Sequence, residues 1–165
     1  MDLTIKQKLE RPFSPKLISW RVGSTNADKT SGLALAYIDA RDVMQRLDEV
    51  CGIDGWQNRY SLSGDGVLIC DIGIRFEFDE GHSWIWKANG AGATDVEAEK
   101  GKASDAFKRA AVLWGIGRYL YSLPSPWVAI KAQGRSYVID KEPILPEWAT
   151  PEGYDAIIAK RSESK

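Results

Sequence analysis

The feature that most constrains this chain is the stretch from Ala93 to Tyr121, which is polar in its first half and apolar in its second. Thr94 and Glu97 have the spacing of a capping box, in which each side chain satisfies a backbone N–H of the other residue, so we expect a long helix to begin there. Residues 110–116 carry no charge, as in a helix that is buried on every side. The rest of the chain must therefore supply a core around this helix.

Two cations, Lys108 and Arg109, lie where the polar half of this helix meets the buried half. A rigid helix would hold them in a fixed geometry that suits an anion. A solvated face with ordinary ion pairs four residues apart, such as Asp105–Arg109, fits the same residues, so the sequence alone leaves both interpretations open. Helical spacing also predicts one stripe that faces the core, made of Phe107, Ala110, Ala111, Trp114, Arg118 and Tyr121.

The segment before this helix has the pattern of an antiparallel sheet. Apolar and polar residues alternate over Val67–Phe78, and this period of two predicts a strand. Trp56–Ser63 precedes it across a turn at residues 63–66, and a third strand carrying Trp84 and Trp86 follows. We therefore expect a β-meander that packs on the helix.

The turn at residues 79–81 decides the register of the second hairpin. A three-residue turn with a left-handed glycine at its end would pair Phe76 with Trp84 and collect the apolar side chains on one face. Arg75 and Lys87 would then share the opposite face, which is open to solvent. On this basis the tryptophans assigned to the core are Trp56, Trp84, Trp86 and Trp114, whereas Trp20 and Trp127 stay unassigned.

A further helix is expected over Ala40–Cys51, between Asp39 as its cap and Gly52 as its left-handed stop. Arg41 lies in its first turn, where a cation opposes the helix dipole, which indicates that Arg41 has a partner elsewhere. The side chains expected to face inward are Val43, Met44, Leu47 and Val50.

Shorter elements complete the chain. We expect a short helix over residues 2–10, a long-looped hairpin of residues 16–22 and 33–38, a hairpin of residues 127–131 and 136–139, and a last helix that begins at Pro151. Residues 1–142 would form one domain, followed by a linker and a short helix at 143–165. The predicted fold class is α+β: an antiparallel β-meander of three to four strands, plus a hairpin, packed on a long central helix.

The composition excludes several classes of function. The net charge is −1, so the chain is not a uniformly basic nucleic-acid binder, although its cations fall in segments that would suit a basic groove. The single histidine, His82, excludes a histidine metal cluster, and Cys51 and Cys70 lack metal-ligand spacing. No apolar run approaches the roughly 20 residues that span a bilayer and no signal-peptide pattern is present, so we expect a cytoplasmic protein.

The sequence contains no catalytic constellation. A metal-dependent nuclease would need an acidic-x-Lys triplet on a strand, and Glu77-Phe78-Asp79 ends in an acid instead. We therefore predict a binding module rather than an enzyme, with no catalytic residue, metal or cofactor. A scaffold module of the double-stranded RNA-binding type and a metal-dependent nuclease are the alternatives.

The segment of residues 104–121 has the sequence S-D-A-F-K-R-A-A-V-L-W-G-I-G-R-Y-L-Y. It resembles the signature helix of the Rad52 superfamily of single-strand annealing proteins, and most of all its phage and bacterial branch. The segment Gly52-Ile53-Asp54-Gly55-Trp56 resembles that family's helix exit, and Ser19-Trp20-Arg21 resembles its hairpin entry. The resemblance spans about residues 16–121.

This resemblance implies an oligomeric ring whose subunits pair their sheets side by side. Single-stranded DNA would lie in an outer basic groove with its bases turned outward, so that a complementary strand can anneal in recombination or repair without ATP. An exonuclease or a single-strand-binding protein would be a partner, and for a phage-encoded protein the compartment would be the cytoplasm of the bacterial host.

The resemblance also implies site residues. Lys108 and Arg109 match the family's groove-lining pair, and Arg41 lies one place from the family's basic residue on the preceding helix. Two positions depart from the family: Val112 replaces a further basic residue one turn after the pair, and Ile53 replaces a frequent aromatic residue. The DNA-binding residues that we add from the sequence itself are Lys102, Lys87 and Arg21.

Overall fold

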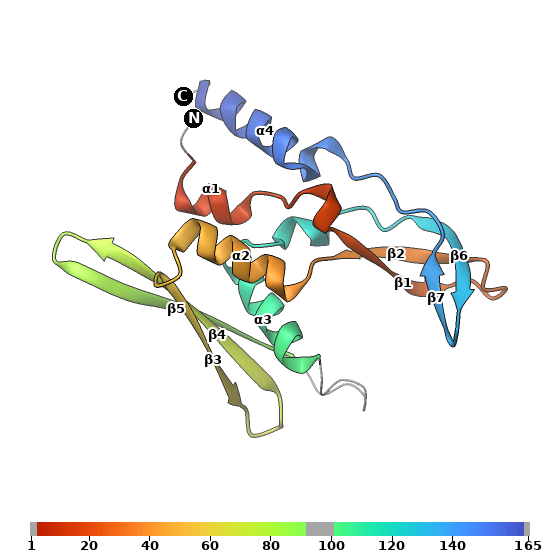
Figure 1. The fold of residues 1–165 in the computed structure, drawn as a ribbon, viewed down its shortest axis with the longest axis horizontal. Coiled ribbons are helices and arrows are strands. Elements are labelled where there is room, and N and C mark those ends of the chain that lie inside the picture. The colour runs from red at the N-terminus through yellow and green to blue at the C-terminus, as the bar shows by residue number, and fades with distance from the viewer. Residues whose placement is uncertain (1–2, 92–100, 164–165) are drawn as a thin grey trace. The chain divides into compact units, whose positions relative to one another are not determined.

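The structure is a computed structural model and describes residues 3–91 and 101–163 (Figure 1). The chain forms two compact units. The first comprises the chain up to Arg11 together with Ala40–Arg118, and the second comprises Pro12–Asp39 together with Tyr119–Lys165. The capping box predicted for Thr94 and Glu97 lies outside the described residues.

The first unit contains a three-stranded antiparallel sheet, and the predicted meander is confirmed. Its strands are β3 (Trp56–Leu62), β4 (Leu68–Phe78) and β5 (Gly81–Ala91), in the order β3-β4-β5. β3 pairs with β4 along its whole length. The alternation that predicted β4 also separates its two faces, because successive side chains of a strand point to opposite sides.

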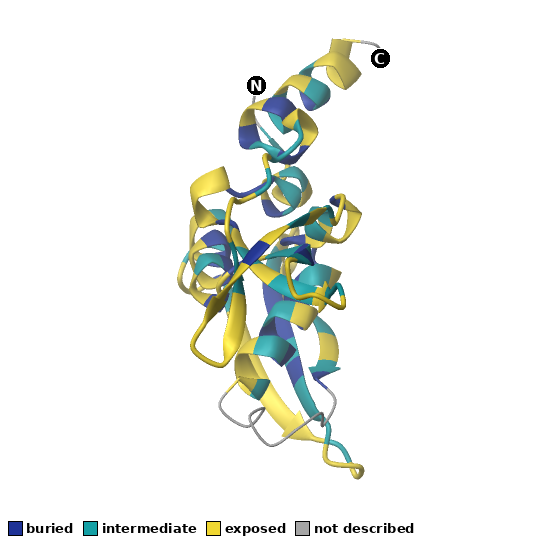
Figure 2. Cartoon of the chain, turned by 90° about the vertical axis from the view of Figure 1, so that its right-hand side faces the viewer, coloured by how far each residue is buried: buried dark blue, intermediate teal, exposed yellow. Residues whose placement is uncertain are grey.

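The helix α3 (Lys102–Leu113) packs against β4 and β5. Its buried residues are Ala106, Phe107, Ala110 and Ala111, which form one stripe. Beneath it, Cys70, Ile72 and Ile74 of β4 are buried on the same face of the sheet. Figure 2 colours the chain by burial, with buried residues in dark blue. The indole N–H of Trp114 donates to the carbonyl oxygen of Ile72 at 3.1 Å and joins the end of α3 to the central strand.

The described helix is shorter than the predicted long central helix. It ends at Leu113, because Gly115 and Gly117 adopt φ angles of +96° and +68°, which a right-handed helix does not allow. A Cβ on Gly115 would also lie 2.5 Å from Cγ of Glu10. The predicted core stripe is therefore wrong at its end, since Arg118 and Tyr121 are exposed.

The register predicted for the β4–β5 hairpin is wrong. Phe78 pairs with Gly81, so the connection is the two-residue turn at 79–80, and Trp84 lies opposite Arg75 instead of Phe76. Lys87 lies opposite Ile72, on the face that α3 covers. Arg75 and Lys87 therefore lie on opposite faces of the sheet, contrary to the prediction.

Trp84 and Trp86 lie on the face of the sheet opposite α3 and are half-buried, so their assignment to the core is wrong. The ring of Trp86 lies directly on Gly73, where a Cβ would be 2.9 Å from three of its ring carbons. The guanidinium carbon of Arg59 is 4.2 Å from the centroid of the same ring. Trp114 is buried as predicted, and Trp56 is half-buried, its ring centroid 6.0 Å from that of Phe107.

Two further helices belong to the first unit. α1 (Ile5–Glu10) begins with a capping box of Thr4 and Gln7, and α2 (Ala40–Cys51) has the predicted bounds. Val43 and Leu47 are buried as expected, whereas Met44 is exposed and the charged Arg46 is buried in its place. Gly52 ends α2 with the predicted left-handed conformation, at a φ angle of +80°.

The second unit contains both predicted hairpins in one curled sheet. Its strands are β1 (Ser19–Thr25), β2 (Ser31–Tyr37), β6 (Trp127–Gln133) and β7 (Ser136–Ile139), in the order β1-β2-β6-β7, with β1 and β7 in contact. The β1–β2 loop is held by Asn26, whose Oδ1 accepts hydrogen bonds from the N–H groups of Thr30 and Ser31 at 2.9 and 3.0 Å.

The predicted last helix is confirmed as α4 (Pro151–Glu163). Short helices connect the other elements: η1 (Pro15–Leu17), η3 (Arg118–Ser122) and η4 (Glu147–Ala149). The fold is thus α+β with antiparallel sheets.

Candidate nucleic-acid interface

The side of α3 that does not face the sheet carries charged residues. Lys102, Asp105 and Arg109 are spaced by three and four residues and therefore share one face of the helix. Nε of Arg109 donates to Oδ2 of Asp105 at 2.9 Å, and the two side chains are 50% and 49% exposed. The ion pair that the spacing predicted is confirmed, and it holds the Arg109 guanidinium at a surface that solvent reaches.

Lys108 is the neighbour of Arg109, about 100° further round the helix. It is half-buried, so neither member of the predicted pair lies in the core. The turn that carries them is tied to the sheet, because Nδ2 of Asn89 on β5 donates to the carbonyl oxygen of Arg109 at 3.4 Å. The two cations therefore stand on a helix whose position is fixed by packing.

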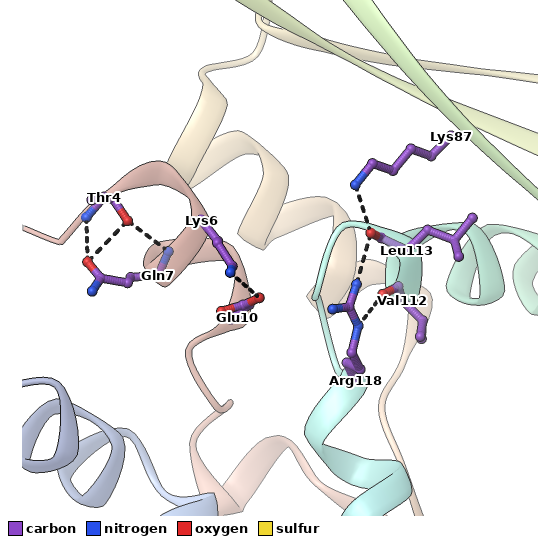
Figure 3. A network of polar contacts seen from close by, with 8 residues as sticks. All are labelled: Thr4, Lys6, Gln7, Glu10, Lys87, Val112, Leu113 and Arg118. Carbon is purple, nitrogen blue, oxygen red and sulfur yellow. Dashed lines mark hydrogen bonds and ion pairs between the residues drawn. The ribbon is translucent and has the colours of Figure 1, made fainter. Parts of the chain in front are cut away.

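Lys87 and Arg118 lie at the other end of α3 (Figure 3). Nζ of Lys87 and Nη2 of Arg118 both donate to the carbonyl oxygen of Leu113, at 3.0 and 2.9 Å. Nε of Arg118 donates to the carbonyl oxygen of Val112 at 2.9 Å. Nζ of Lys87 also lies 4.3 Å from the centroid of the Trp114 ring, within the range of a cation–π interaction.

The structure brings some of the predicted site residues together. Lys102, Lys108 and Arg109 share α3, and Lys87 contacts the end of that helix. Arg41 is exposed in the first turn of α2, a helix that packs against α3. Arg21 is exposed on β1 and belongs to the second unit.

The sequence that contains this helix also matches a family model. The model described as "Rad52/22 family double-strand break repair protein" matches residues 3–64 and 65–138. This chain belongs to the Rad52/22 family. The resemblance found in the sequence is thereby confirmed. The matched segments include α3 and every cation predicted to bind DNA.

Two relatives of this Rad52/22 chain carry the name "Single-stranded DNA-binding protein DdrA". The protein from Deinococcus deserti is 38% identical over 161 residues, which cover 90% of this chain and 71% of the relative. The protein from Deinococcus radiodurans is 37% identical over 155 residues, which cover 90% of this chain and 68% of the relative.

Sequence reasoning missed Arg118, which it placed in the core stripe. The signal that indicates its true position is Gly115-Ile116-Gly117, because glycines directly after an apolar helical run mark a left-handed stop. A cation that follows such a stop is well placed to contact the last carbonyl groups of the helix. The contact of Lys87 with the end of α3 could be predicted only from the correct register of the β4–β5 hairpin, and the sequence did not give that register.

Over residues 3–91 and 101–163, no three histidine, cysteine or acidic side chains are grouped closely enough to hold a metal ion. In the same residues, no helix combines the length and the apolar character that crossing a membrane requires. The two cysteines of the first unit are free thiols. Burial, followed by the nearby carboxylate of Asp48, raises the pKa of Cys51 to about 11, and burial also raises the pKa of Cys70.

Proposed function

We propose that this Rad52/22-family chain binds single-stranded DNA without regard to sequence and anneals complementary strands during recombination and double-strand break repair. The observation that carries the proposal is the cationic face of α3 in a chain whose relatives are named single-stranded DNA-binding proteins. Because its substrate is DNA, we place the activity in the compartment that holds the DNA, the bacterial cytoplasm.

The proposed site of the first unit has Lys108 and Arg109 at its centre and Lys102, Arg41 and Lys87 as further cations. Arg21 of the second unit is proposed as a separate DNA contact. Cations that neutralise phosphates release the counterions condensed on DNA, so binding is expected to weaken as salt rises. The bases take no part in these contacts and stay available for pairing. Sequence is then read by the complementary strand and not by the protein.

The proposed assembly is a ring. In the described sheet β3 and β5 are the outer strands, and each presents an edge that no other described strand covers. Such edges pair readily with a strand of another chain. A ring would repeat the α3 cations and multiply weak contacts with one DNA strand, which explains how a chain of net charge −1 can hold DNA. Measuring the mass of the protein with and without single-stranded DNA tests this: a single closed species supports the ring, and a monomer in both conditions contradicts it.

The annealing activity is tested with two complementary labelled oligonucleotides in the absence of any nucleotide. We expect the protein to accelerate duplex formation well above the spontaneous rate, and added ATP to change nothing, because no phosphoryl transfer is involved. Single-stranded competitor should abolish the acceleration at concentrations where duplex DNA or duplex RNA does not. Equal competition by duplexes would favour a double-stranded RNA-binding type of module, and cleavage of the strands on adding magnesium would favour a nuclease.

A further inference from the structure

We infer that Lys87 and Arg118 form a second phosphate site at the C-terminal end of α3, which receives the DNA backbone after Lys108 and Arg109. The inference rests on the proposed function, since the anion concerned is a backbone phosphate of single-stranded DNA. It adds Arg118 to the DNA-binding residues and gives Lys87 a geometric role that the sequence did not predict.

The charges of Lys87 and Arg118 lie close together. Their nitrogen atoms share one acceptor, the carbonyl oxygen of Leu113, so they lie no more than about 6 Å apart and repel each other. Within the part of the chain that the structure describes, neither side chain contacts a carboxylate. Two cations this close attract an anion more strongly than either does alone.

Both side chains are held in place before any ligand binds. Arg118 donates from Nε and Nη2 to two successive carbonyl groups, and Lys87 is held between the same helix end and the face of Trp114 (Figure 3). The negative end of the helix dipole stabilises both cations there. An ammonium has three N–H donors and a guanidinium has five, so both retain donors beyond those that bind the helix.

The Lys87–Arg118 pair lies one helical turn beyond Arg109 along α3. Leu113 lies four residues after Arg109, on the same face and about 6 Å further along the axis. This step exceeds the rise of about 3.4 Å between phosphates of one strand in stacked DNA, and so suits an extended strand. The Lys87–Arg118 pair thus lies at the C-terminal end of α3, and Lys102 and Arg109 precede it along the helix.

The test must separate a phosphate contact from a purely structural cap. Lys87→Gln and Arg118→Gln keep a hydrogen-bond donor for Leu113 but remove the charge. We expect each variant to stay folded, with only a small fall in melting temperature from the lost helix-dipole and cation–π interactions. Each should bind labelled oligo-dT about tenfold more weakly at low salt. The slope of log affinity against log salt is negative, and its magnitude should fall by about 0.7, the value for one phosphate contact on a single strand. The double variant should lose little more than either single variant, because both act on one phosphate.

Arg59→Gln is the matched control, because Arg59 is also stacked on a tryptophan but lies on the opposite face of the same sheet. Its salt slope should equal that of the parent protein. If the Lys87 and Arg118 variants keep the parent slope while Lys108→Ala/Arg109→Ala lowers it, the second site is wrong and the proposed function stands. If the parent protein shows no binding to oligo-dT, the proposed function itself fails.

A measurement on the parent protein keeps the inference testable if a variant does not fold. Lysine acetylation, read by mass spectrometry, should fall several-fold at Lys87 when oligo-dT is bound. Exposed Lys6 on α1 serves as the internal control and should react at the same rate with and without DNA. Equal acetylation of Lys87 in free and DNA-bound protein would overturn the assignment.

Discussion

Arg46 is a charged side chain in the interior of the first unit, with 9% of its surface exposed. Its Nη1 donates to the carbonyl oxygens of Lys8 and Leu9 at 3.1 and 3.4 Å, and to that of Arg11. These are the last carbonyl groups of α1 and of its cap, which no longer have partners within the helix. Arg46 therefore joins α2 to the end of α1, although its spacing in the sequence gave it no core position.

The contribution of Arg46 is tested by Arg46→Met, which keeps the apolar stem and removes the donors. We expect the free energy of unfolding to fall by about 2–4 kcal/mol, because buried carbonyl groups lose a charged donor. Gln45→Met on the exposed side of α2 is the control and should change stability by less than about 0.5 kcal/mol. Equal denaturation midpoints for the two variants in urea would contradict the role of Arg46.

The raised pKa of Cys51, about 11, makes a prediction about reactivity. Only the thiolate is alkylated, and a raised pKa means that the thiol stays protonated at pH 8. The thiolate fraction there is about a hundredfold lower than for a thiol with a pKa near 9. Alkylation by iodoacetamide, followed at this cysteine by mass spectrometry, should be correspondingly slow and should rise tenfold per pH unit up to about pH 11. A rate that levels off near pH 9 would show that burial does not raise the pKa of the Cys51 thiol.

At the scale of the elements, the β4–β5 hairpin depends on a glycine. The Trp86 ring lies on Gly73, so Gly73→Ala forces a methyl group against three ring carbons. We expect a loss of about 1–3 kcal/mol in the free energy of unfolding, the usual cost of overpacking. Gly64→Ala, where a Cβ meets no atom within 4 Å, should be close to neutral.

A double-mutant cycle isolates the contact. In a Trp86→Ala background the clash is absent, so Gly73→Ala should cost much less than in the parent chain. The same penalty in both backgrounds would mean that the ring does not lie on Gly73.

The elements themselves were largely predictable, and their ends and registers less so. The bounds of α2 follow from its cap, its periodicity and Gly52, which all act locally. The register of β4 and β5 was missed because the prediction required all the aromatic residues to share one face. Periodicity cannot show that a second face of a sheet is covered by its own side chains, such as Trp86 and Arg59. The glycine in Ile72-Gly73-Ile74 was the local signal that a ring lies above the strand.

The candidate site was predictable in part for the same reason. Lys108 and Arg109 could be proposed from the helix and from the family resemblance, since both depend on contiguous residues, and the structure bears out only that they lie outside the core of the first unit. The grouping of Lys87 with Arg118 depends on strand pairing and on where α3 ends. Those are tertiary properties, because they require residues that are distant in the sequence to be placed correctly.

At the scale of the whole molecule, the family match extends over both compact units and ends before α4. The described sheet of the first unit leaves the edges of β3 and β5 uncovered, and α3 presents its cations beside that sheet. In the proposed ring, one element therefore supplies the DNA contacts and another supplies the contacts between subunits. A variant in α3 should then alter DNA binding without altering the assembly.

The most direct test of this account is the salt dependence of oligo-dT binding by Lys108→Ala/Arg109→Ala. The matched control is Lys160→Ala/Arg161→Ala, an adjacent lysine and arginine in the last turn of α4, outside the residues that the family model matches. We predict that the α3 variant keeps the mass of the parent assembly, whereas the negative slope of log affinity against log salt becomes less steep by about 1.4, about 0.7 for each phosphate contact. The control should keep the parent slope. A folded α3 variant with the affinity and slope of the parent protein would contradict the account.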